Sequence, residues 1–196
     1  MSLSLKTQTQ IYLGLFERET HPWLNRLSEG IATAIDIGAA HGEYTLYFLT
    51  KTKATKVFAF EPNVSLSPYL HENLRLNALE PSPRLEISSK FLGVSETEQE
   101  TQLDSLAPLV RTPCFIKMDV DGAEQQILEG AKAINALSDV RWLIETHSGK
   151  LESHCERILT DAGFRTTIIP NAPWRIFLPE LRPIEHNRWM AAWKVS

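Results

Sequence analysis

The chain has 196 residues, 43% hydrophobic and 22% charged, which is the composition of an ordinary globular domain and excludes a disordered or fibrous chain. Its formal net charge of −4 disfavours nucleic acid and anionic membranes as partners, because it provides no attraction to phosphate groups. The two cysteines lack C-x-x-C spacing and predict neither a disulfide framework nor a thiolate zinc site. No apolar stretch nears the ~18 residues that span a bilayer. We therefore expect one cytoplasmic domain.

Residues 1–29 predict a helical cover that precedes a main domain of residues 30–196. Pro22 is expected to divide this cover into two helices, because proline lacks the amide hydrogen that a helix interior needs. The apolar residues that share one helical face are Tyr12, Phe16, Trp23, Leu24 and Leu27.

Short apolar runs alternate with amphipathic segments from Ile31 onward. The runs predicted as strands are 31–37, 56–60, 84–88, 114–118, 140–144, 164–169 and 187–195. The segments predicted as helices are 43–52, 65–79, 122–137 and 150–162, and Gly130 falls inside the third. This alternation predicts an α/β fold with a doubly wound, mostly parallel sheet, its last two strands paired antiparallel at the edge. The polar segment 95–104 is expected to be a solvated loop.

The stretch AIDIGAAHGEYTLYF, residues 34–48, runs from the first strand through a glycine loop into a helix. Ligands of open α/β sheets bind outside the carboxyl ends of the strands, and glycine lets backbone amides approach a ligand closely. Asp36 and Glu43 would repel a pyrophosphate, and the G-x-G-x-x-G spacing of nicotinamide-binding loops is absent. The loop therefore favours a cationic ligand, although a tight turn capped by Asp36 has the same pattern.

Glu61 ends the second strand, 25 residues after Asp36, where an acid accepts hydrogen bonds from both ribose hydroxyls of a nucleoside. An acid that merely ends a strand before Pro62 is the alternative. The two features together predict a positively charged nucleoside, S-adenosylmethionine. The expected cofactor-binding residues are Asp36, Gly38, Ala39, Gly42, Glu61, Pro62 and Asn63.

These segments resemble the class I S-adenosylmethionine-dependent methyltransferases, and among them the FkbM family. The resemblance covers residues 30–165 and is most specific over 116–124, IKMDVDGAE, which LEGA follows at 128–131. Four other segments also resemble this family: the loop 36–42, the segment 60–63, the element 101–106 and the strand end 145–147. The resemblance implies a Rossmann-like sheet of seven strands, S-adenosylmethionine as cofactor, and oxygen methylation of a small-molecule acceptor such as a sugar or secondary metabolite.

Four polar residues follow two predicted strands with the same i, i+2 spacing: Asp119 and Asp121 after one, Glu145 and His147 after the other. We expect Asp119 to position the acceptor or the methyl donor, and His147 or Asp121 to take the acceptor's proton; no metal ligand is assigned. Four alternatives stay open. Asp121 and Glu124 match a capping box, in which both residues would serve the helix end. Glu145 would instead form a salt bridge with a neighbouring side chain, and His147 would form a hydrogen bond with the backbone. In the fourth alternative, Asp119, Glu145 and His147 together hold Mn²⁺ or Fe²⁺.

Other side chains in the sequence favour structural roles. His41 is expected at the surface, and Lys117 is expected to point across the sheet. Trp142, Trp189 and Trp193 are expected in the core, whereas Trp174 lies in a loop that is suited to act as a lid.

Three further functions are weighed against methyl transfer to a small molecule. A non-catalytic module that binds the cofactor for assembly or sensing is disfavoured by the intact loop acids, and a nicotinamide oxidoreductase by the loop spacing. Methylation of a nucleic-acid amine is disfavoured because residues 119–122, DVDG, replace the Asn/Asp-Pro-Pro-aromatic stretch of such enzymes. The P-loop, the G-x-S-x-G elbow and H-E-x-x-H are also absent. The sequence leaves a homo-oligomer open.

Overall fold

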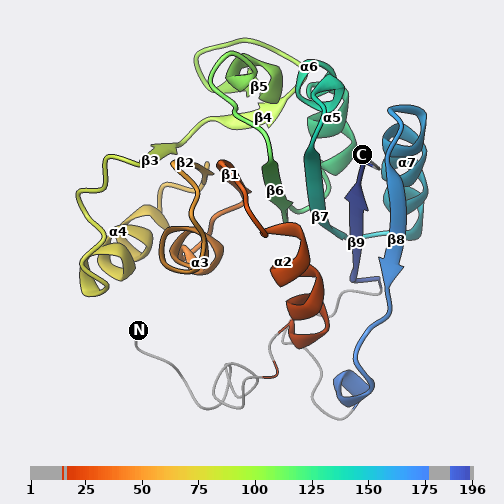
Figure 1. The fold of residues 1–196 in the computed structure, drawn as a ribbon, viewed down its shortest axis with the longest axis horizontal. Helices are drawn as coiled ribbons and strands as arrows, with labels where there is room; N and C mark the ends of the chain where they lie inside the picture. The colour runs from red at the N-terminus through yellow and green to blue at the C-terminus, as the bar shows by residue number, and fades with distance from the viewer. Residues whose placement is uncertain (1–14, 16, 177–185, 195–196) are drawn as a thin grey trace.

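A computed structural model describes residues 15, 17–176 and 186–194, which form a central sheet with helices on both faces (Figure 1). The strands of its seven-stranded sheet lie in the order β3 (Leu85–Ser88), β2 (Lys56–Phe60), β1 (Thr33–Ile37), β6 (Cys114–Met118), β7 (Val140–Thr146), β9 (Arg188–Trp193) and β8 (Arg165–Ile169). Only β9 runs antiparallel to its neighbours, β7 and β8. The predicted doubly wound α/β sheet is therefore confirmed, with the antiparallel strand next to the edge.

The central strands are apolar because helices cover both of their faces. Every residue of β1 and β6 is buried, so neither strand shows the polar alternation of a half-exposed sheet. Trp142 and Trp189, on the neighbouring strands β7 and β9, are completely buried, as expected for core residues. The charged residues of β1 and β6 are Asp36 and Lys117, which are both buried and lie opposite each other.

One face of the sheet is covered by α2 (His21–Leu27), α3 (Glu43–Lys51) and α4 (Ser67–Leu76). Pro22 lies in the first turn of α2, directly after the short helix η1 (Arg18–Thr20), which confirms that it begins a separate helix. Arg141 on β7 anchors the end of α2 by donating to the backbone oxygens of Leu27 and Glu29. Tyr12 and Phe16 lie outside the described residues, and a domain boundary at residue 29 remains a prediction.

The opposite face carries α5 (Glu124–Glu129), α6 (Lys132–Ala136) and α7 (Gly149–Asp161). The prediction of a single helix over 122–137 is wrong, because the helix is interrupted at Gly130, between α5 and α6. A Cβ at that position would lie 2.1 Å from the backbone oxygen of Gly93, so the glycine admits a neighbouring strand at the break. The helix ends where tertiary packing requires this close approach.

That neighbouring strand belongs to a second, two-stranded sheet, so the expectation of a solvated loop over 95–104 is only partly correct. Strand β4 (Phe91–Gly93) pairs in parallel with β5 (Glu100–Gln102), and the short helix η2 (Leu103–Leu106) follows. The carboxylate of Glu100 accepts hydrogen bonds from the amides of Val94 and Ser95, which closes the intervening turn. Buried Leu103 then anchors the polar segment to the core.

Within the described part of the chain, no helix is both long and apolar enough to cross a membrane. The cytoplasmic location expected from the sequence remains a prediction.

Candidate cofactor and catalytic site

The glycine loop follows β1 and is fastened to the ends of two neighbouring strands. The amides of Gly38 and Ala39 both donate to the backbone oxygen of Phe60, each over 3.0 Å. Gly38 has a φ of +74°, and a Cβ there would lie 1.8 Å from the backbone oxygen of Asp119. Only glycine therefore lets the loop pass this close to the end of β6.

Glu61 braces the loop from the end of β2. One carboxylate oxygen accepts from the amide of Ala40 over 2.7 Å, and the other accepts from the amide of Asn63 over 2.8 Å. Each oxygen retains a second lone pair, so the carboxylate is still able to accept a ligand hydroxyl. Gly42, with a φ of +93°, then starts α3, and a Cβ there would lie 2.4 Å from the side chain of Leu70.

A cavity of ≈ 310 Å³ opens beside Glu61, past the ends of β2 and β3. Its remaining lining comes from Val64, Ser67, Pro68, Leu70, Ile87 and Ser89. Pro62 and Asn63 follow Glu61 at the surface, where Asn63 closes a local turn by accepting from the amide of Ser65. The cavity thus places apolar walls around one anchored carboxylate, as expected for a small-molecule site.

Asp36 lies beneath the loop, not at its rim. Its side chain is 0% exposed, accepts from the hydroxyl of Thr45 over 2.6 Å, and lies 3.5 Å from the ammonium of Lys117. Burial raises the pKa of Asp36, and Lys117 opposes that shift. Its part in cofactor binding stays a prediction, because the carboxylate reaches a ligand only through the loop above it.

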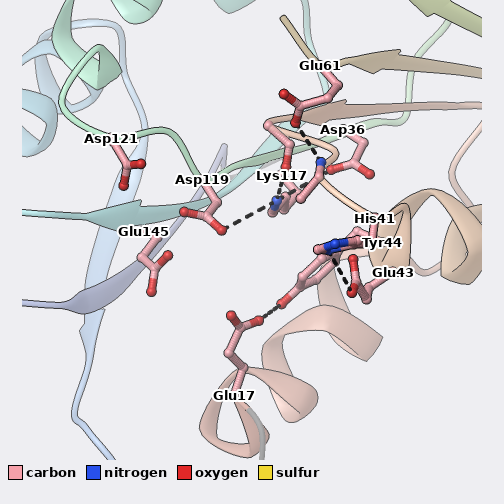
Figure 2. Close-up of polar contacts among 12 residues, drawn as sticks. Glu17, Asp36, His41, Glu43, Tyr44, Glu61, Lys117, Asp119, Asp121 and Glu145 are labelled. Atoms are coloured by element: carbon pink, nitrogen blue, oxygen red, sulfur yellow. Dashed lines mark hydrogen bonds and ion pairs between the residues drawn. The ribbon is translucent and has the colours of Figure 1, made fainter. Parts of the chain in front are cut away.

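Lys117, which we expected to point across the sheet, lies on the same face as Asp36 because the two residues are cross-strand partners. Its ammonium donates to the backbone oxygen of Gly38 over 2.9 Å and lies 3.8 Å from a carboxylate oxygen of Asp119 (Figure 2). Burial lowers the pKa of Lys117, but the surrounding carboxylates outweigh it, so the pKa is raised and the side chain stays charged. Lys117 therefore ties the glycine loop to Asp119.

Glu17 and Tyr44, which were not recognised from the sequence, lie next to Lys117 on the side away from Glu61 (Figure 2). The hydroxyl of Tyr44 donates to the carboxylate of Glu17 over 2.6 Å, and the ammonium of Lys117 lies 4.9 Å from the centre of the Tyr44 ring. Burial and the charge of Glu17 raise the pKa of Tyr44 well above its ordinary value. The residues before α2 thus reach the helix that follows the loop.

Asp119, Glu145 and His147 converge past the ends of β6 and β7, as the shared i, i+2 spacing predicted. The Nε2 atom of His147 lies 3.7 Å from an oxygen of Asp119 and 3.6 Å from an oxygen of Glu145. Asp121, whose side chain is 76% exposed, also has an oxygen 3.7 Å from that nitrogen. The four polar side chains expected to converge therefore surround one small volume.

The capping box of Asp121 and Glu124, one of the alternatives left open by the sequence, does not form. The N-cap of α5 is Ala123, with no side-chain hydrogen bond, and the carboxylate of Glu124 turns into the protein. There it binds Nδ1 of His147 over 2.6 Å. Burial lowers the pKa of His147, but this contact and the other carboxylates outweigh burial, so the pKa is raised.

The remaining candidates lie at the margin of the site. The His41 side chain is partly exposed, as expected, and its ring contacts that of Tyr69 with centroids 5.4 Å apart. Trp193 is only partly buried and packs against Trp23, with ring centroids 5.3 Å apart. Trp174 lies in the short helix η3 (Pro173–Ile176), and its role as a lid remains a prediction.

The strand order and the glycine loop define the class I methyltransferase architecture. The family model described as "Methyltransferase FkbM domain" matches residues 74–166, the part that contains β6, β7 and the carboxylate cluster. The resemblance seen in the sequence is therefore confirmed over residues 74–166. The comparison with curated protein sequences gave no match.

Solved methyltransferase structures share the fold. An FkbM methyltransferase from Methylobacillus flagellatus aligns with a TM-score of 0.61 and 21% identity over 83% of this chain, which spans only 43% of that protein. An S-adenosylmethionine-dependent O-methyltransferase from Thermotoga maritima aligns at 0.57 and 19% identity, over 92% of this chain and 65% of the other. A putative tRNA methyltransferase from Streptococcus pneumoniae, solved with S-adenosyl-L-methionine, aligns at 0.58 and 13% identity, over 92% and 72%.

Proposed function

We propose that this protein transfers a methyl group from S-adenosylmethionine to a hydroxyl of a small molecule. S-adenosylmethionine is the cofactor that the domain and the fold indicate. The observation that carries the proposal is the glycine loop, in which Gly38 and Gly42 leave no room for a side chain and the Ala40 amide donates to Glu61 at the mouth of the cavity. Glu61 would accept the ribose hydroxyls, and the cavity beside it would take the nucleoside.

The reaction needs little from the protein beyond alignment. The acceptor oxygen bonds to the methyl carbon while the carbon–sulfur bond breaks, its electron pair stays on sulfur, and S-adenosylhomocysteine leaves. Alignment of two reactants supplies effective molarities on the order of 10⁵ to 10⁸ M, whereas a general base supplies about 10² to 10⁴-fold. Lys117 holds Asp119 near the loop. As a group that positions the reactants, Asp119 would therefore contribute more to the rate of methyl transfer than a general base would.

The acceptor's proton would pass to His147 or Asp121. Both lie next to Asp119, and the exposed Asp121 is able to return the proton to solvent. Single-turnover kinetics on His147→Gln and Asp121→Asn test these roles: loss of the base should slow methyl transfer by about 10² to 10⁴-fold. Full rates in both variants would remove both residues from the mechanism.

A small-molecule acceptor is supported by the acidic chain, whose net charge of −4 does not favour a polyanion. RNA methyltransferases share the fold, so the acceptor screen includes RNA. Release of S-adenosylhomocysteine would be measured with sugars, hydroxylated metabolites, tRNA and ribosomal RNA fragments. Turnover with RNA alone would refute the small-molecule proposal.

Isothermal titration calorimetry with S-adenosylmethionine and S-adenosylhomocysteine tests the cofactor site. Glu61→Gln should weaken both ligands about tenfold or more, because it removes the charge that holds the ribose hydroxyls. Glu86→Gln is the matched control, since Glu86 lies on β3 and pairs with Lys56 outside this cavity. Equal binding by all three proteins would refute the role of Glu61.

Two other functions are outcomes of the same experiments. Binding of both nucleosides without turnover of any acceptor would favour a module for assembly or sensing. Binding of NAD(P)H in place of S-adenosylmethionine would favour an oxidoreductase. Sedimentation equilibrium would decide whether the protein is a homo-oligomer.

A further inference from the structure

The space between the ends of β6 and β7 is lined by oxygen atoms on several sides and by one imidazole nitrogen. Figure 2 shows the carboxylates of Asp119, Asp121 and Glu145 around this space. The Nε2 atom of His147 lies 3.6–3.7 Å from an oxygen of each of them. These separations are too long for hydrogen bonds, so the imidazole is near all three carboxylates without a hydrogen bond to any of them.

His147 is held in this orientation from behind. Glu124 is completely buried, and its carboxylate binds Nδ1 of His147 over 2.6 Å. The side chain of His147 is 10% exposed, and its buried Nε2 has no hydrogen-bond partner among the residues that the structure describes. A carboxylate that binds one ring nitrogen and aims the other at acidic groups is the usual arrangement around a metal-ligating histidine.

The distances fit a shared ion. Two atoms bound about 2.2 Å from one cation, at angles of about 90° to 110°, lie roughly 3.1–3.6 Å apart. The observed separations from Nε2, 3.6 Å to Glu145 and 3.7 Å to Asp119, lie at and just above the top of this range, so a small inward movement would complete the coordination. One ligand atom each from Asp119, Glu145 and His147 lies within 4.8 Å of the others.

We propose that Asp119, Glu145 and His147 bind a divalent first-row cation of the Mn²⁺ or Fe²⁺ class. A single imidazole among carboxylates suits these ions better than Mg²⁺ or Ca²⁺, which prefer all-oxygen sites, or structural Zn²⁺, which prefers nitrogen and sulfur. Glu124 is a positioning residue, because it touches His147 and not the ion.

Binding of the cation is independent of methyl transfer, whereas its use in catalysis rests on the proposed function. A bound cation would occupy Nε2 of His147 and leave Asp121 as the residue that receives the acceptor's proton. It would also orient the acceptor oxygen and acidify its hydroxyl. The site would then combine alignment and deprotonation at one point.

Electron paramagnetic resonance of Mn²⁺ tests the site directly on the full chain after treatment with a chelator. The wild-type protein should bind one Mn²⁺, and nitrogen coupling in the pulsed spectrum should identify the imidazole. His147→Gln should lose this coupling and bind at least tenfold more weakly. Absence of binding at millimolar Mn²⁺, or a bound ion without nitrogen coupling in the wild type, would overturn the proposal.

Two more variants separate ligation from folding. Glu124→Gln should weaken Mn²⁺ binding by about 10- to 100-fold, because the partner that orients His147 loses its charge. Glu98→Gln removes an equal charge from an exposed site in the segment before β5 and should leave binding unchanged. Equal affinity in wild type, Glu124→Gln and His147→Gln would show that the ion binds elsewhere.

Calorimetry with S-adenosylmethionine on the chelated protein distinguishes the two proposals. Retained nucleoside binding without Mn²⁺ binding overturns only the metal site. Mn²⁺ binding without nucleoside binding overturns only the methyltransferase proposal. Binding of Zn²⁺ but not Mn²⁺ would refute the assignment to the oxygen-preferring ions.

Discussion

The buried pair of Asp36 and Lys117 predicts a strong coupling between two residues of neighbouring strands. The carboxylate and the ammonium lie 3.5 Å apart, with side chains 0% and 3% exposed. At an effective dielectric constant of about 20, this separation corresponds to roughly 5 kcal/mol of attraction, from which the cost of desolvating both groups is subtracted. Removal of one partner leaves the other charge buried, so Lys117→Met alone should lower the free energy of unfolding by about 3–5 kcal/mol.

The double-mutant cycle isolates this coupling. The double variant with Asp36→Asn and Lys117→Met should lose at least ~2 kcal/mol less free energy of unfolding than the sum of the two single variants, as is typical of buried ion pairs. The reason is that the double variant removes both charges of the pair, so neither is left buried without the other. Asp119, 3.8 Å from the same ammonium, limits the recovery. Urea unfolding followed by tryptophan fluorescence measures each corner of the cycle.

A surface pair on the same sheet provides the matched control. Lys56 and Glu86 lie only 2.9 Å apart, but their side chains are 34% and 55% exposed. Their coupling should be about 0.2–1 kcal/mol despite the shorter distance, because water screens both charges. A coupling in the buried pair no larger than that of the surface pair would refute the reasoning.

Two further perturbations test the loop and its cover. Gly38→Ala should lower the free energy of unfolding, measured by urea unfolding, by about 2 kcal/mol more than Gly30→Ala does. Both glycines have a positive φ, but only a Cβ at Gly38 would collide with backbone atoms. Equal losses in the two variants would contradict this close contact. Tyr44→Phe should cost about 1.5–3 kcal/mol at pH 7 through its lost bond to Glu17. Because the folded-state pKa of Tyr44 is raised above 10.0, its contribution is complete below pH 10 and declines above it, so the gap between wild type and variant should narrow by up to about 1.4 kcal/mol per pH unit. A gap that stays constant from pH 8 to 11 would contradict the raised pKa.

The fold was largely predictable because its signals are local. Apolar runs that alternate with helical periodicity predicted the strands and most helices, and Gly163, with a φ of +86°, follows the C-cap of α7, where glycine commonly stops a helix. The break at Gly130 was not predictable in the same way, since its cause is a backbone oxygen of Gly93 in a distant strand. Strands of three residues, such as β5, are also too short to show a period.

In the candidate site, too, the residues with local signals were predictable and those with distant partners were not. Asp119, Glu145 and His147 were placed together because residues two apart on a strand share a face and adjacent parallel strands end at one edge. The role of Glu124 was not predictable, because its spacing from Asp121 satisfies a local capping rule whereas its actual partner, His147, is 23 residues away. Lys117 did carry a signal, since a lysine inside a buried apolar strand requires a buried acid nearby.

The position of β9 determines when the sheet is able to close during synthesis. This strand is the last in the chain among those described, yet it lies between β7 and β8 and pairs with both. While the ribosome still holds residues 188–193, neither neighbour has its partner, and each presents open backbone groups. Emergence of β9 would therefore join β8 to the rest of the sheet, because β9 is the strand through which β8 pairs with it.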